Sequence, residues 1–159
     1  MHALVIAQYG LFMVAWSVLD SVVQAALGKE LRLDATRTHI VTTGMQFRQR
    51  VTVLCGLLRL HGLEHTEALK LLQRVEKNAK RNMLVHGHII VGVPGQLRFV
   101  KTSALEDGLS AKSVSFTAES LQKHVMLITA TTQRLQSLLG VSDADIQALA
   151  DEAIRVSAL

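Results

Sequence analysis

Three residue types suited to phosphodiester chemistry occur together at residues 81–87, which read Arg-Asn-Met-Leu-Val-His-Gly. A guanidinium binds phosphate through two parallel hydrogen bonds, and an imidazole exchanges a proton near neutral pH. Asn82 and His86 are four residues apart, so on a helix they share one face, and Arg81 is adjacent to it. Because glycine commonly ends helices, Gly87 predicts that this motif occupies a last helical turn.

These groups suit metal-free cleavage of RNA, in which a ribose 2′-hydroxyl attacks the neighbouring phosphorus. His86 would move the proton, Asn82 would orient the imidazole, and Arg81 would bind the phosphate and offset its developing charge. The reaction needs a proton acceptor and a proton donor, but the motif supplies one histidine per chain. A symmetric pair of chains would complete the set. A second interpretation stays open, in which the three residues only stabilise the end of a helix.

The order of Arg81 and Asn82, three further residues, His86 and Gly87 resembles the signature of the HEPN superfamily (higher eukaryotes and prokaryotes nucleotide-binding). That signature is an arginine, four to six residues and a histidine, often with a polar residue after the arginine; here the gap is the shortest. The motif is also similar to a bacterial group that reads Arg-Asn, three residues, His-Gly. The likeness extends loosely along the chain, from a first helix with Asp20 to a helix that returns after a β-like insert.

The resemblance implies a single HEPN-like helical domain over residues 1–159 that forms a homodimer, with the two motifs close together across the interface. It also implies metal-independent endoribonuclease activity without a cofactor, in many members as part of toxin–antitoxin or defence systems, and hence an antitoxin partner. Some members bind only RNA, nucleotides or a protein. A non-catalytic helical dimerisation or interaction module is therefore the alternative function.

A line of basic residues precedes the motif on the same predicted helix. Its members follow one another at intervals of four or three residues, with one more cation beside them, and the line ends at Arg81. Such a line suits a nucleic-acid backbone, but a solvated helix face has the same pattern. The candidate RNA-binding residues are Lys70, Arg74, Lys77 and Lys80.

The composition indicates one globular domain and a helical core. The chain has 159 residues, is 49% hydrophobic and 19% charged, and contains one proline, which excludes disordered, collagen-like and low-complexity proteins. Aromatic residues make up only 4%, so aliphatic side chains must form most of the core. The net charge of +4 attracts polyanions. The one cysteine, Cys55, lies in an apolar run, which predicts a buried thiol and a reducing, cytoplasmic compartment.

Hydrophobic spacing predicts a mainly α fold of four to five helices with a short β-like hairpin insert at about residues 88–116, and the resemblance implies that the helices form an up-and-down bundle. The predicted helices cover about residues 4–27, 35–60 with a break near Gly44, 66–85, 117–139 and 143–156. The insert places extended segments 97–103 and 112–116 around a turn at Asp107-Gly108. The expected helix N-caps are Thr117 and Ser142, and the expected helix ends are Gly28, Gly87 and Gly140.

The first predicted helix is apolar enough to raise the question of a membrane anchor. Residues 3–27 contain one formal charge, Asp20, but Gln8 and Ser17 also interrupt the run. An acidic side chain is costly inside a bilayer, and no lysine or arginine precedes the run as in a signal peptide. We therefore expect a central helix buried on several sides, with no membrane contact.

Residues 61–65 read His-Gly-Leu-Glu-His, which is the string of one class of zinc peptidase. Zinc would require both histidines on one turn of a stable helix, and Gly62 is expected to break the helix. No third ligand is apparent downstream. We interpret the string as chance and expect no metal site.

Overall fold

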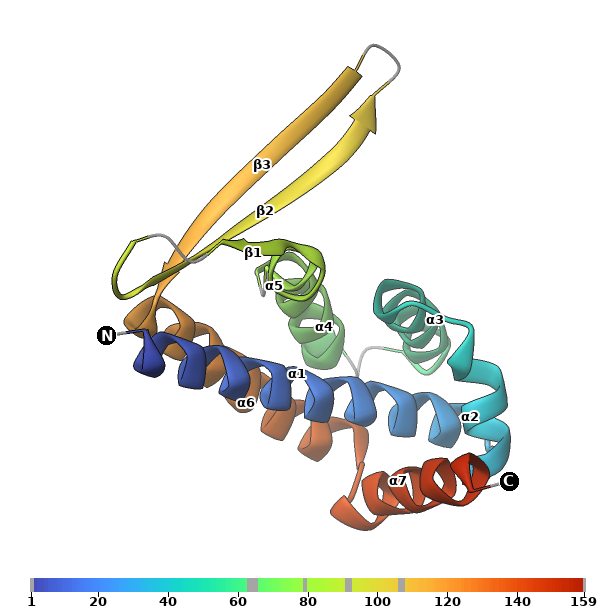
Figure 1. Ribbon diagram of the computed structural model, residues 1–159. Coiled ribbons are helices and arrows are strands. Elements are labelled where there is room, and N and C mark those ends of the chain that lie inside the picture. Colours follow the sequence, from blue (N-terminus) through green and yellow to red (C-terminus); the bar gives the residue numbers. More distant parts are fainter. Residues whose placement is uncertain (1, 63–65, 79, 91–92, 106–107, 159) are drawn as a thin grey trace. The chain divides into compact units, whose positions relative to one another are not determined.

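The computed structural model describes residues 2–62, 66–78, 80–90, 93–105 and 108–158, apart from the side chains of residues 66, 76–78, 81, 82 and 105. Figure 1 shows a mainly α fold with a three-stranded antiparallel sheet, which confirms the predicted fold class with its β insert. The helices are α1 (Ala3–Glu30), α2 (Ala35–Thr43), α3 (Phe47–Leu60), α4 (Thr66–Asn78), α5 (Arg81–His86), α6 (Ala118–Leu139) and α7 (Asp143–Ser157). The strands are β1 (His88–Ile90), β2 (Gln96–Leu105) and β3 (Gly108–Thr117).

Contacts divide the chain into two compact units. The first, here called the hairpin unit, comprises residues 1–16 and 77–128. The second, here called the helical unit, comprises residues 17–76 and 129–159. The hairpin unit therefore contains α5 and the whole sheet, whereas the helical unit contains α2, α3 and α7.

Two of the predicted helices are divided, so the described chain has more helices than the four to five expected. The predicted helix over 35–60 consists of α2 and α3, with the expected break at Gly44, the C-cap of α2. The expectation of one helix over 66–85 is wrong, because α4 ends at Asn78 and α5 begins at Arg81. Before α5, Lys80 has a φ of 52°, a left-handed conformation that interrupts an α-helix.

The predicted N-caps begin α6 and α7, and the predicted glycine follows the end of α6. At the start of α6, the Ser120 N–H donates to the Thr117 hydroxyl, and the Thr117 N–H donates to the Ser120 hydroxyl. Ser142 and Asp145 exchange the same kind of bonds at the start of α7. Gly140 follows α6 with a φ of 60°, the left-handed conformation that glycine adopts most easily.

Gly28 does not end α1, contrary to expectation, because the helix continues to Glu30. Gly28 instead allows close packing, since an added Cβ would collide with the Thr38 side chain of α2. Just after the helix, Arg32 has a φ of 54°, and the Leu33 N–H donates to the Gly28 C=O at 2.8 Å. This is the hydrogen bond of a Schellman motif with arginine at the position usually held by glycine.

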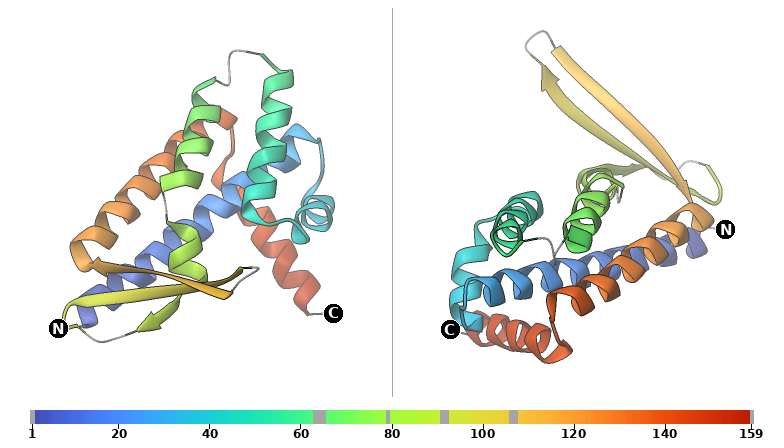
Figure 2. Two further views of the ribbon diagram at one scale, coloured as in Figure 1. Left: turned by 90° about the horizontal axis from the view of Figure 1, so that it is seen from above. Right: turned by 180° about the vertical axis from the view of Figure 1, so that it is seen from behind.

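An aromatic cluster forms the core of the hairpin unit beneath one face of the sheet. The sheet order is β1-β2-β3, and β2 and β3 pair along their whole length, as Figure 2 shows from two sides. Phe99 of β2 and Phe116 of β3 are buried with ring centroids 5.6 Å apart. The ring of Tyr9 in α1 lies 5.4 Å from that of Phe99. The rings thus join α1 to the sheet.

Ion pairs between helices hold the helical unit together over an aliphatic core. The best-enclosed pair joins Asp20 of α1 to Arg50 of α3 at 2.6 Å. His39 of α2 donates through Nε2 to the Leu149 C=O of α7 at 2.7 Å. Further pairs between segments are Glu30 with His61, Glu67 with Arg134, and Lys29 with Asp145.

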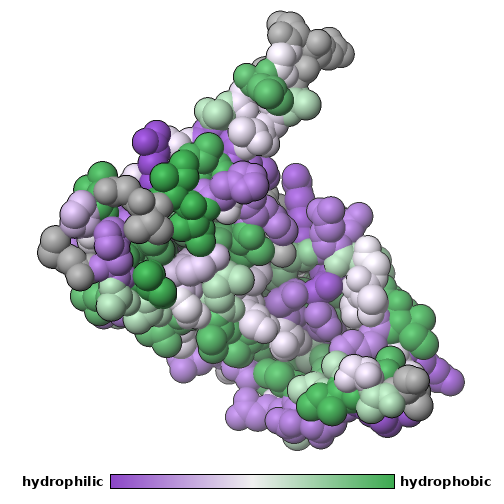
Figure 3. Space-filling view, in the orientation of Figure 1, coloured by the Kyte–Doolittle hydropathy of each residue, from purple (hydrophilic) through white to green (hydrophobic). Residues whose placement is uncertain are grey.

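The two ends of α1 differ in burial. Residues 22–28 are largely buried, which confirms the expectation of a helix enclosed on several sides for this part. Over residues 3–18 one face is exposed, and Figure 3 shows hydrophobic residues at the surface along this part of α1. By length and composition α1 is also able to cross a membrane, a criterion that core helices and signal sequences meet as well.

Candidate functional site

The helix α5 carries the predicted motif and is anchored at its middle. Leu84 is fully buried, and its C=O accepts a hydrogen bond from the Tyr9 hydroxyl at 2.9 Å. Burial raises the pKa of Tyr9, so its hydroxyl remains a donor at neutral pH. This contact fixes α5 against α1 within the hairpin unit.

Gly87 ends α5, as expected, because the chain passes close to β2 at this point. Its backbone is extended, with a φ of −79°. An added Cβ would collide with the Met83 C=O and lie 3.3 Å from the Cβ of Phe99. Space, rather than a left-handed φ, therefore requires glycine here.

The structure describes the predicted catalytic residues to different extents. His86 is the last residue of α5, and its side chain is exposed. Arg81 and Asn82 begin the same helix, and their side chains lie outside the described part of the chain. The α5 backbone places Asn82 one turn before His86, which is the spacing that the proposed chemistry requires.

The line of basic residues expected along one helix is interrupted. Lys70 and Arg74 are exposed on α4 in the helical unit, whereas Lys80 is exposed just before α5 in the hairpin unit. The side chain of Lys77 lies outside the described part. Because Lys80 is left-handed, the helical phase of α4 does not continue into α5, and the expectation of one continuous line to Arg81 is wrong.

Two lysines that the sequence analysis did not single out face each other on the hairpin. Lys101 of β2 pairs directly with Lys112 of β3. Side chains alternate along a strand, so both lie on the face of Phe99, about 7 Å farther along β2. The end of α5 approaches Phe99 through Gly87, so α5 ends against β2, the strand that carries Lys101.

Two lysines directly opposite each other destabilise the pairing of their strands when no anion is bound between them. Like charges directly opposite destabilise strand pairing, by about 0.2–1 kcal/mol on the scale of cross-strand pairs. Within the described residues neither Lys101 nor Lys112 forms an ion pair. The expected turn at Asp107-Gly108 does not give this pair, because Gly108 belongs to β3 and pairs with Leu105, which sets the register that joins Lys101 to Lys112.

The net positive charge of the chain belongs to the hairpin unit. Its residues include seven lysines and arginines against three acidic residues, whereas the helical unit has ten of each. Glu119 is the one acidic residue in the described part of the hairpin unit, and it pairs with Lys123 at 2.7 Å. The hairpin unit is therefore the part of the molecule that attracts polyanions.

His124 of α6 is a second histidine of the hairpin unit, but it is not suited to proton transfer. Its ring packs edge-on against Phe116 at 5.7 Å, and the buried Nε2 has no hydrogen-bond partner among the described residues. Burial and the nearby charge of Lys80 lower the pKa of His124. The imidazole is therefore neutral at pH 7 and half-buried.

Three other candidates are explained by the fold. Asp20 pairs with Arg50 in the helical unit. Cys55 is buried in α3, as predicted. His61 ends α3 and pairs with Glu30 at 2.8 Å, while residues 63–65 of the zinc-peptidase string lie outside the described residues. Within the described residues no cluster of histidine, cysteine and acidic side chains could hold a metal ion.

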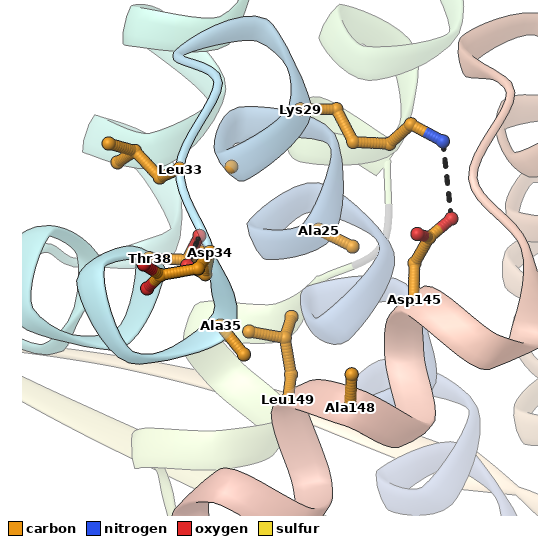
Figure 4. A pocket seen from close by; sticks show the side chains of 10 residues that line it. Ala25, Lys29, Leu33, Asp34, Ala35, Thr38, Asp145, Ala148 and Leu149 are labelled. Atoms are coloured by element: carbon orange, nitrogen blue, oxygen red, sulfur yellow. Dashed lines mark hydrogen bonds and ion pairs between the residues drawn. The ribbon is translucent and has the colours of Figure 1, made fainter.

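A pocket of about 220 Å³ lies in the helical unit between the end of α1, the start of α2 and α7 (Figure 4). Its polar groups already have structural partners. Lys29 donates to Asp145 and to the Gly140 C=O, and Asp34 accepts from the Arg37 N–H at the start of α2. The pocket therefore offers no uncommitted polar group among these residues.

No protein-family model matches the chain, and neither a curated protein nor a solved structure matches it.

Proposed function

We propose that this chain is a HEPN-like, RNA-directed protein of the cytoplasm and a metal-independent endoribonuclease that acts as a homodimer. The proposed catalytic residues are Arg81, Asn82 and His86. The observation that supports the proposal best is the exposure of His86 at the end of α5, on the unit that carries the opposed Lys101–Lys112 pair and the whole net positive charge.

The proposed reaction is an internal phosphoryl transfer. The ribose 2′-oxygen attacks phosphorus, the bond to the 5′-oxygen breaks, and the products are a 2′,3′-cyclic phosphate and a 5′-hydroxyl. One imidazole removes the 2′ proton and a second protonates the leaving oxygen, so each subunit of the dimer supplies one His86. Arg81 binds the phosphate, while Lys101 and Lys112 bind neighbouring phosphates of the backbone.

Two parts of the basic line remain in the proposal as secondary RNA contacts. Lys80 belongs to the hairpin unit and lies just before the motif, whereas Lys70 and Arg74 belong to the neutral helical unit. An antitoxin that covers the α5 site is the proposed protein partner.

A non-catalytic helical dimerisation or interaction module is the second candidate function. The exposed apolar face of α1 favours it, because such faces mark contact surfaces. In that case α5, which comprises Arg81–His86, serves to join α1 to the sheet and has no role in cleavage.

The test is incubation of mixed RNA with the protein in EDTA. We expect the wild type to produce cyclic-phosphate ends and His86→Ala to slow cleavage about 100-fold or more. His88→Ala is the matched control, since His88 is an equally exposed histidine two residues away, and it should retain wild-type activity. Equal, negligible cleavage by the wild type and His86→Ala would remove the enzymatic claim and favour the interaction module.

A further inference from the structure

The exposed face of α1 has the spacing of a helix–helix seam. Leu4, Ala7, Leu11, Val14 and Val18 follow one another at intervals of three and four residues, and all five are exposed. This is the a/d pattern of a heptad repeat, which places its members along one stripe of a helix. The stripe extends about 21 Å along α1.

The rest of this face has no charged side chain. Beside the stripe lie Ala3, Gly10 and Ser17, which are exposed and occur seven residues apart. Small side chains beside a seam let a second helix approach closely. Because this face of α1 carries no charge, two copies of the helix can meet without repulsion between like charges.

The exposed area is sufficient for a symmetric pair. On the stripe, the large side chains Leu4, Leu11, Val14 and Val18 are 42–64% exposed. With the exposed small residues Ala3, Ala7, Gly10 and Ser17 they present on the order of 500 Å² per chain, so two copies would bury on the order of 1,000 Å², near the lower bound for a specific interface. A two-fold contact uses the same patch on both chains, and the regular spacing of the stripe makes it self-complementary.

We propose that a second copy of this chain docks on the α1 stripe, so that the protein dimerises through paired α1 helices. A helix partner explains the seam spacing, which a bilayer does not require. A helix lying on a membrane surface also has lysine or arginine along its polar face, and α1 has none before Lys29.

This proposal does not rest on the RNA-directed function, but it limits the dimer geometry that this function can use. Tyr9, which binds α5, lies about 180° around the α1 axis from the stripe. Pairing along α1 therefore leaves each α5 on the outer side of the dimer, accessible to a ligand. This contact alone does not bring the two copies of His86 together, so a site that needs both would require a second contact between chains.

The oligomeric state of the full chain tests the proposal, measured by light scattering and analytical ultracentrifugation without detergent. We expect a dimer for the wild type, and a dissociation constant raised about 100-fold or more in Val14→Glu, which buries a charge in the seam. Ile40→Glu is the matched control, because Ile40 is a comparably exposed apolar residue on α2. It should dimerise as the wild type does, and thermal melts should show that both variants fold.

Three results would overturn the proposal. The first is a wild-type monomer at tens of micromolar. The second is a dimer that Val14→Glu leaves intact, which would place the interface elsewhere. The third is wild-type protein that binds neutral phosphatidylcholine vesicles and is released by Val14→Glu, which would identify lipid as the occupant. None of these measurements uses RNA cleavage, so their results do not depend on the ribonuclease proposal.

Discussion

The hairpin unit and the helical unit use their charged residues differently. In the helical unit, cations and acids are equal in number, and ion pairs such as Asp20–Arg50 join separate helices. In the hairpin unit, aromatic rings form the contacts between elements, and cations outnumber acids. Two of those cations, Lys101 and Lys112, face each other across a strand pair.

This difference separates residues that stabilise the fold from residues available to a ligand. A cation bound to an acid of another helix is already neutralised, so it contributes little to attracting a polyanion. Opposed lysines weaken the sheet that holds them, and a bound phosphate would relieve their repulsion. The comparison therefore favours the hairpin unit as the surface of the proposed RNA-directed function.

The largest expected effect concerns the aromatic core of the hairpin unit. Phe99→Ala removes the ring that contacts both Tyr9 and Phe116, and should lower the free energy of unfolding by about 3–5 kcal/mol. Urea denaturation measures this change. Leu109→Ala on the same hairpin is the control, because Leu109 is 81% exposed and should change stability by less than about 0.5 kcal/mol. Similar losses in both variants would contradict the assigned core.

The next effect tests the ion pairs of the helical unit. Arg50→Met leaves Asp20 without its partner at a half-buried position, and should lower the free energy of unfolding by about 2 kcal/mol. Arg59→Met, at an exposed position of α3, is the control with little expected change. A second change of Asp20→Asn should recover part of the loss. If Arg50→Met is as stable as the wild type, the pair does not hold α1 to α3.

Acidification should weaken the hairpin unit before the helical unit. The pKa of His124 lies below its usual value near 6.5, so between the two values the unfolded state binds protons that the folded state does not. Stability therefore falls as the pH drops below about 6.5. In the helical unit, Arg155 and Thr36 lower the pKa of Glu152 to about 2, so its contribution is lost only as the pH falls from 4.5 towards 2.

Hydrogen-exchange protection factors at pH 7 and pH 5.5 measure this order. We expect a larger loss of protection in residues 88–90 and 96–105 than in α7, and His124→Phe should remove the difference. An equal loss in both units, or a loss that persists in His124→Phe, would contradict the role of His124.

The smallest expected effects concern two basic residues whose backbone is left-handed. Arg32 and Lys80 have φ values of 54° and 52°, so glycine at either position relieves strain and should raise the free energy of unfolding by about 0.5–1 kcal/mol. Lys80→Gly should also weaken binding to RNA, because it removes a cation of the hairpin unit. Arg32→Gly should leave RNA binding unchanged. Thermal melts measure the stability of both variants, and RNA titrations measure their affinities. Equal RNA affinities of the two variants would contradict the prediction.

The features that the sequence predicted correctly depend on local chemistry. The caps at Thr117 and Ser142 and the end at Gly140 need only neighbouring residues, so their types identify them. The break before α5 has no such signal, because Ala79 and Lys80 both favour helix. Packing of Leu84 under Tyr9 and of Gly87 against Phe99 involves distant parts of the chain, and these contacts favour a separate α5.

The candidate site was predictable to a similar extent. The Arg81–His86 spacing is local, and α5 retains it in the backbone. The Lys101–Lys112 pair depends on the strand register, which the expected segments 97–103 and 112–116 did not specify. The expected line from Lys70 to Arg81 assumed one helix, and the left-handed Lys80 invalidates that assumption.

The salt dependence of RNA binding tests most directly whether the hairpin unit is the functional surface. Fluorescence anisotropy with labelled single-stranded RNA would compare Lys101→Gln/Lys112→Gln with the matched pair Arg32→Gln/Arg59→Gln of the helical unit, all in a His86→Ala background that keeps RNA intact. The account predicts that the lysine variant makes the slope of log K against log salt shallower by about 1.4, as expected for two lost phosphate contacts, while the arginine variant keeps the original slope. Equal slopes in both variants, or a larger change in the arginine variant, would contradict it.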